Sequence, residues 1–122
     1  MLAPLLVATQ PQYTATTAVY EGLNWLGNAP SGRVLAMPGV GLYIPAYSGD
    51  TVYVGHYDET FDYFNKTQTA LAVLTGKADL EQFIQENDIR YVVWTVDLRS
   101  PPPVALGAPA YDTPDFKIWR LY

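Results

Sequence analysis

RYVVWTV, residues Arg90–Val96, is a near-continuous apolar run. A run of this kind is typical of a parallel strand that is buried on both faces of a sheet. Two shorter apolar segments precede it, RVLAM at Arg33–Met37 and TVYVG at Thr51–Gly55, and the second is rich in β-branched and aromatic residues. We therefore expect these three segments to form strands that lie side by side in one sheet.

The residues between the first two strands decide how those strands are joined. Pro38–Gly49 is about a dozen residues long, which is near the minimum for a crossover between parallel strands. We interpret this segment as a glycine turn followed by one or two helical turns that stop at Gly49. A hairpin about Ser48–Asp50 is the competing interpretation.

Two longer helices are expected around these strands. The first is capped by Thr14 or Thr17 and ends at about Leu26, before a Gly-Asn pair. The second has Asp58 as its N-cap and runs over Glu59–Thr75. Its predicted buried stripe is made of Phe61, Phe64, Leu71 and Leu74.

The last third of the chain completes the predicted architecture. A short helix follows Asp79, which has capping-box spacing to Gln82, and five prolines within residues 100–114 predict a long irregular loop. FKIWRLY, residues Phe116–Tyr122, is a strand with mixed faces, which predicts a place at a sheet edge. The order of elements indicates an α/β fold: a small, mostly parallel, Rossmann-like sheet flanked by helices, with the last strand at an edge.

Composition limits both the domain and its partners. The 122 residues are 49% hydrophobic and 16% charged, which excludes a disordered tail. The chain has no cysteine, so it has no disulfide, no thiolate nucleophile and no zinc site of the cysteine type. Seven basic and twelve acidic residues give a net charge of −5, which argues against a nucleic-acid partner. We assign residues 13–122 to a single domain and expect no cofactor.

Residues 1–12 form a leader outside that domain. Met1–Ala8 reads MLAPLLVA, is interrupted by Pro4, and lacks the basic start of a signal peptide. It is also shorter than the ~20 apolar residues that a membrane helix needs. Two interpretations stay open: a frayed or artificial end, and the outer end of a transmembrane helix that lies upstream.

Candidate binding residues follow the first two strands. Gly39 and Gly41 come directly after the first strand, with Tyr43 close behind, and His56 follows the second. The carboxyl ends of strands are where open α/β sheets place their ligands. We therefore name Gly39, Gly41, Tyr43, His56 and Glu59 as candidate ligand-binding residues.

Each of these residues also has an ordinary structural explanation. Gly39 and Gly41 permit a tight turn, and Ile44 stands where a dinucleotide-binding fingerprint has its third glycine. Glu59 and Asp62 lie in the first turn of a predicted helix, where the helix dipole favours negative charge. This explanation is favoured over a metal site, so we assign neither metal-binding nor catalytic residues.

Several segments, in this order and spacing, resemble one family. They are YEGLNWL (20–26), RVLAMPGVGLYIPAYSG (33–49), TVYVGHYDET (51–60), FIQENDIRYVVW (83–94) and the closing FKIWRLY (116–122). The chain is similar to the extracytoplasmic C-terminal domain of bacterial multi-pass membrane glycosyltransferases of the GT-C type. These are related to the dolichyl-phosphate-mannose and aminoarabinose transferases.

The resemblance implies a location and a context. It implies a soluble, non-catalytic accessory domain on the extracytoplasmic face of the cell membrane, attached to a transferase that uses a polyprenyl-phosphate-linked sugar. The implied partners are the membrane-embedded part of the same protein and a lipid-linked sugar or glycan acceptor. In that family the catalytic acidic residue lies in the membrane part, so no residue of this chain receives that role.

Two alternatives come from other functional classes. One is a stand-alone soluble α/β module that binds a small ligand at the carboxyl ends of the first two strands. The other is a small enzyme that uses His56 together with Glu59.

Overall fold

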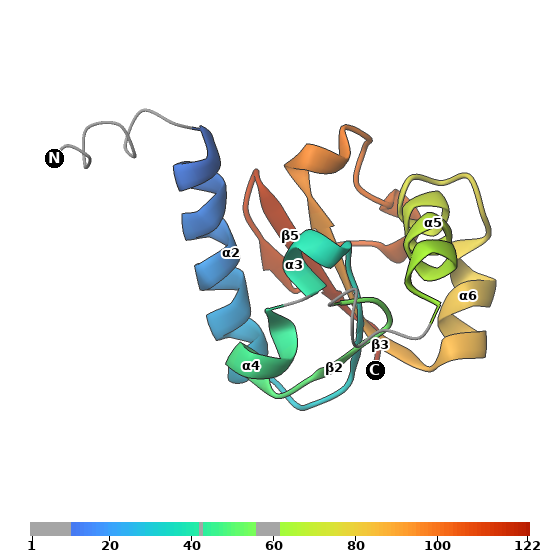
Figure 1. Ribbon diagram of the computed structural model, residues 1–122, viewed down its shortest axis with the longest axis horizontal. Helices are drawn as coiled ribbons and strands as arrows, with labels where there is room; N and C mark the ends of the chain where they lie inside the picture. The colour runs from blue at the N-terminus through green and yellow to red at the C-terminus, as the bar shows by residue number, and fades with distance from the viewer. Residues whose placement is uncertain (1–10, 42, 56–61) are drawn as a thin grey trace, which may run out of the picture.

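Five strands form one mixed sheet at the centre of the molecule (Figure 1). The computed structural model describes residues 11–41, 43–55 and 62–122, and its strand order is β2-β1-β3-β5-β4. The strands are β1 (Arg33–Leu35), β2 (Thr51–Val52), β3 (Ile89–Thr95), β4 (Tyr111–Asp112) and β5 (Phe116–Arg120). β1 is parallel to β2 and β3, whereas β5 is antiparallel to β3 and β4.

The prediction of a mostly parallel sheet is wrong, although its three expected strands do lie side by side and parallel. Five residue pairs join β3 to β5, against three between β1 and β3 and two between β1 and β2. The cause is the segment after β3, which forms only the short 3-10 helices η1 (Val96–Leu98) and η2 (Val104–Leu106) before β4. Parallel pairing usually needs a crossover helix, and without one the chain returns antiparallel.

The last strand is also not at the edge of the sheet. β4 pairs with the outer side of β5, so β5 lies between β3 and β4. β4 forms inside the proline-rich segment that was expected to be irregular throughout. The β4–β5 hairpin is closed by Thr113, whose hydroxyl oxygen accepts a hydrogen bond from the Phe116 amide at 3.0 Å.

Helices cover both faces of the sheet (Figure 1). One face carries α2 (Pro11–Gly27), α3 (Pro38–Gly41) and α4 (Ile44–Ser48), and the other carries α5 (Tyr63–Leu74) and α6 (Leu80–Asn87). α2 begins before the predicted caps at residues 14 and 17. The predicted crossover is confirmed, because α3 and α4 connect two parallel strands and α4 ends at Gly49, whose φ is 77°. The competing hairpin is not formed.

The strands send alternate side chains into two separate cores. In β3, Tyr91 and Val93 pack in the core beneath α2, whereas Val92 and Trp94 pack in the core beneath α5 and α6. All four side chains are buried, so the prediction of a strand covered on both faces is confirmed. The α2 core also contains Leu23, Leu26, Val34, Ala36, Val40, Ile44, Phe116 and Ile118.

α5 buries a different face from the predicted one. Its buried side chains are Ala70, Val73 and Leu74, whereas Phe64 is 82% exposed and Leu71 is 39% exposed. The core beneath α5 already holds Trp94 and Trp119, so small side chains on the helix fit close to the sheet. Of the predicted stripe only Leu74 is confirmed as buried.

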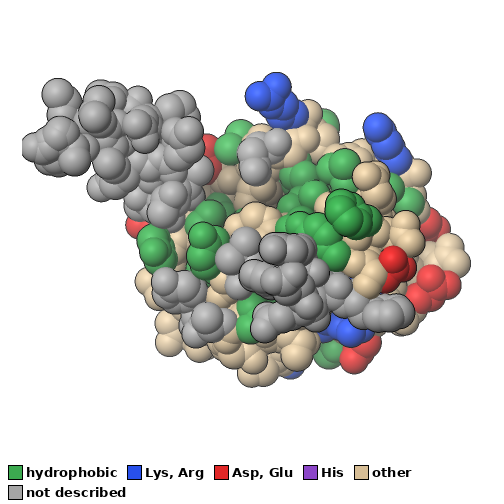
Figure 2. All heavy atoms as spheres, viewed as in Figure 1, with side chains coloured by type: hydrophobic (Ala, Val, Ile, Leu, Met, Phe, Trp, Pro, Cys, Tyr) green, Lys and Arg blue, Asp and Glu red, His purple; other side chains and the backbone are tan. Residues whose placement is uncertain are grey.

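Parts of the α5 prediction lie outside the described residues. These are the N-cap Asp58, the helix start at Glu59 and the stripe residue Phe61. The described helix begins at Tyr63. On the face viewed in Figure 2, hydrophobic side chains gather between α3 and α5.

The predicted start of α6 is confirmed, because the Asp79 carboxylate accepts a hydrogen bond from the Gln82 amide at 3.1 Å.

Two leucines of α5 test which face of this helix is buried. Leu74→Ala should lower the free energy of unfolding by about 2–5 kcal/mol, because it removes a side chain that is 1% exposed and leaves a cavity. Leu71→Ala should lower it by less than about 1 kcal/mol. Urea denaturation of both variants measures the difference, and equal losses would contradict the observed face.

Candidate functional site

Gly41 lies where α3 comes closest to the chain that follows β2. A Cβ atom at Gly41 would lie 2.3 Å from the carbonyl oxygen of Val54, and one at Gly55 would lie 3.2 Å from the carbonyl oxygen of Gly41. Backbone contact therefore occupies this position at the carboxyl ends of β1 and β2. The glycine at position 41 has a structural reason, which is the close approach of two backbones.

The other predicted site residues are not brought together in the described part of the chain. Gly39 is exposed, and a Cβ atom there would meet nothing within 4 Å. Tyr43 is 45% exposed. His56 and Glu59 lie outside the described residues. A ligand site at the carboxyl ends of the strands therefore stays a prediction.

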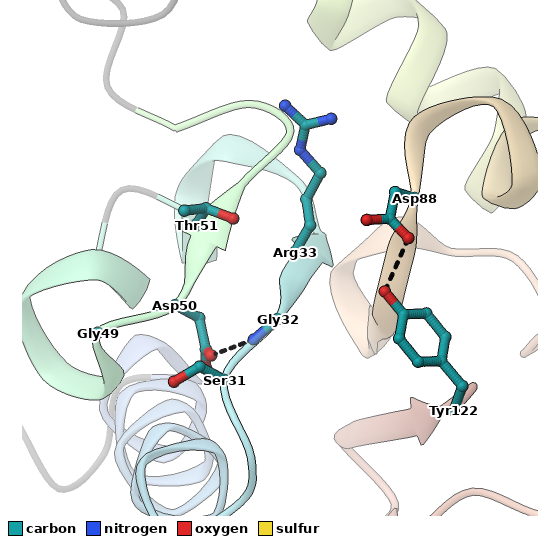
Figure 3. Close-up of a pocket in the computed structure, with 8 residues that line it drawn as sticks. All are labelled: Ser31, Gly32, Arg33, Gly49, Asp50, Thr51, Asp88 and Tyr122. Atoms are coloured by element: carbon teal, nitrogen blue, oxygen red, sulfur yellow. Dashed lines mark hydrogen bonds between the residues drawn. The ribbon is translucent and has the colours of Figure 1, made fainter.

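A cavity lies at the opposite ends of the parallel strands, where β1, β2 and β3 begin (Figure 3). Its volume is about 510 Å³. It is lined by Ser31, Gly32, Arg33, Gly49, Asp50, Thr51, Asp88 and Tyr122. The sequence did not predict this cavity. Polar residues just before strands are ordinary turn residues, and the lining residues are too far apart in the sequence to form a recognisable motif.

Asp50 forms one wall of the cavity and is the single charged side chain buried within the described ranges, at 3% exposure. One carboxylate oxygen accepts a hydrogen bond from the Gly32 amide at 2.9 Å (Figure 3). The other accepts one from the Ser48 hydroxyl at 2.8 Å. The bond to Gly32 therefore holds the chain ahead of β1 against the chain ahead of β2, and the bond to Ser48 fixes the Asp50 carboxylate locally. The role of Asp50 is to fix this wall.

Tyr122 and Asp88 form the facing wall. The Tyr122 hydroxyl donates a hydrogen bond to the Asp88 carboxylate at 2.8 Å. This bond, with smaller contributions from desolvation and from the Asp88 charge, raises the pKa of Tyr122 above its usual value. The nearby Arg90 acts in the opposite direction. A tyrosine with a usual or raised pKa is protonated at neutral pH, so its hydroxyl can donate to Asp88.

Arg90 connects the two walls behind the cavity. Its guanidinium donates to the carbonyl oxygen of Ser31 at 2.8 Å and to that of Tyr122 at 3.0 Å. It also lies 5.1 Å from the centroid of the Tyr122 ring, within cation–π range. One side chain at the start of β3 thus holds both the chain before β1 and the chain after β5.

Nowhere in residues 11–41, 43–55 and 62–122 do three or more His, Asp or Glu side chains gather in a way that could hold a metal ion. No helix within the same ranges is both long and apolar enough to cross a membrane.

Comparisons with models of protein families, with curated proteins and with solved structures find no match.

Two glycines of α3 test the close approach at the carboxyl ends of the strands. Gly41→Ala should lower the free energy of unfolding by about 1–3 kcal/mol, because the new methyl group meets a backbone carbonyl that cannot move aside. Gly39→Ala should leave it unchanged or raise it by up to about 1 kcal/mol. Thermal melts of the two variants measure the contrast, which the absence of any Gly41→Ala effect would contradict.

Asp50 should contribute to stability in a way that an exposed carboxylate does not. Asp50→Ala leaves the Gly32 amide without its acceptor, and should lower the free energy of unfolding by about 1–3 kcal/mol. The control is Asp112→Ala, which removes an exposed ion pair with Lys117 and should cost less than about 1 kcal/mol. Equal melting temperatures for these variants would show that Asp50 does not hold the wall.

Proposed function

We propose that this chain is an extracytoplasmic accessory domain of a membrane glycosyltransferase that uses a polyprenyl-phosphate-linked sugar. Its partner is the membrane-embedded part of the same protein, which carries the catalytic residues. The observation that carries the proposal is the ordered series of segments from YEGLNWL to FKIWRLY. The spacing of that series over most of the chain is its most specific feature.

The structural roles of these segments support an accessory rather than a catalytic function. Leu26, at the end of YEGLNWL, is fully buried in the α2 core. RVLAM supplies β1, and the segment up to Gly49 supplies the crossover helices. The residues that carry the resemblance are therefore those that specify the fold. A series of this kind is expected of a domain whose task is structural.

The hydrogen bonding of the polar residues favours the same role. Asp50 uses both carboxylate oxygens to hold neighbouring backbone and side chain, and Arg90 donates to two backbone carbonyls. A general base or an electrostatic catalyst needs its polar groups aimed at a substrate instead. In this proposal the parallel strands β2-β1-β3 form the Rossmann-like part of the domain.

The complete natural gene provides the first test. Upstream of the codon for Met1, the proposal expects several apolar segments of ~20 residues each. It also expects that a full-length protein lacking residues 13–122 loses transfer activity or stability. A natural start at Met1 with no such segments in the same reading frame would contradict the proposal and favour the stand-alone module.

The isolated chain should catalyse no transfer. Incubated with lipid-linked sugars and acceptor, it should give only the background rate, because a hydrophobic donor needs a membrane-embedded groove. Radiolabelled sugar transfer measures this directly. Turnover that disappears in both His56→Ala and Glu59→Gln would overturn the proposal and favour the small enzyme.

A further inference from the structure

The cavity ahead of β1 and β2 carries two opposite charges that are not paired with each other. Arg33 is the first residue of β1, and Asp88 directly precedes β3 (Figure 3). Among the described residues, one ion pair has its nitrogen and oxygen atoms within 4.0 Å of each other, and it joins Lys117 to Asp112, not Arg33 to Asp88. Arg33 and Asp88 are therefore further apart than an ion pair, yet both line the same cavity.

Each of the two charged groups is held in place by one hydrogen bond and keeps bonding capacity. The Arg33 guanidinium donates through one nitrogen to the carbonyl oxygen of Asn87 at 3.0 Å. Its other N–H groups have no acceptor among the described residues. Asp88 accepts from Tyr122 through Oδ1, and its Oδ2 has no donor among those residues. A guanidinium has five N–H donors and a carboxylate accepts through both oxygens.

The charges around the cavity disfavour a simple ion as its ligand. One cation and two carboxylates, those of Asp50 and Asp88, line it. Arg33 and Asp88 line the same cavity, so the Asp88 charge disfavours an anion near Arg33, and the Arg33 charge disfavours a cation near Asp88. A small molecule with one charge of each sign, oriented along this pair, is attracted at both ends.

We propose that this cavity binds a small zwitterion, of which a free α-amino acid is the simplest case. The ligand carboxylate would accept from the free N–H groups of Arg33, and its ammonium group would donate to Asp88 Oδ2. The cavity volume of about 510 Å³ lies within the range of small-molecule sites. This inference does not depend on the proposed transferase context.

The affinity should be modest, because the cavity is open and Asp88 is exposed. Solvent weakens charge contacts at an open site, so a dissociation constant on the order of millimolar or weaker is expected. An affinity in this range would serve a site that responds to abundant solutes.

A titration followed by amide NMR tests the proposal with three matched probes. L-Alanine carries both charges, N-acetyl-L-alanine carries only the carboxylate, and L-alaninamide carries only the ammonium group. L-Alanine should shift the amide signals of Gly32, Thr51 and Ile89 saturably, and the other two probes should bind at least about tenfold more weakly. Equal affinity for the three probes, or no saturable shift with L-alanine, would overturn the proposal.

Substitutions at the two charges identify the site. Arg33→Gln and Asp88→Asn should each weaken L-alanine binding by at least about tenfold, whereas Lys117→Gln, on the β4–β5 hairpin, should leave it unchanged. Asparagine tolerates the positive φ of 53° at position 88 and still accepts from Tyr122, so Asp88→Asn should fold. Unchanged L-alanine binding in folded Asp88→Asn would overturn the assignment, whatever the stability of Arg33→Gln.

Discussion

Burial of β3 on both faces is the constraint on which the rest of the structure depends. Its side chains alternate between two cores, so each face of the sheet needs its own helical cover. α2 and α4 supply one cover, and α5 and α6 supply the other. Both long edges of β3 also need a paired strand, and β1 and β5 provide it in opposite directions.

The polar amino end of the same strand organises the cavity. Asp88 precedes β3 and bonds Tyr122, while Arg90 reaches the chain before β1 and the chain after β5. The apolar side chains of β3 thus determine how the helices cover the sheet. The polar residues around its amino end determine the walls of the cavity. Asp50 completes these walls by holding the starts of β1 and β2 together.

The sequence identifies elements better than it identifies how they meet. The apolar run at Arg90–Val96 correctly indicated a strand buried on both faces, and Gly49 correctly ended the crossover. Strand direction after β3 was not readable, because it depends on a proline-rich segment that builds short turns instead of a helix. The buried face of α5 was also predicted wrongly, because large Phe64 is exposed, whereas small Ala70 is buried in the core that contains Trp94 and Trp119. The cavity brings together residues far apart in the sequence, and no local pattern marks it.

Native-state hydrogen exchange is the most direct measurement of the central role of β3. If this strand is the shared centre of both cores, the amides of Val92, Val93 and Trp94 should exchange only through global unfolding. The amides of Tyr111 and Asp112 in the edge strand β4 should exchange faster, through local opening. Exchange of the β3 amides at the rate of those in β4 would contradict a sheet built around a doubly buried strand.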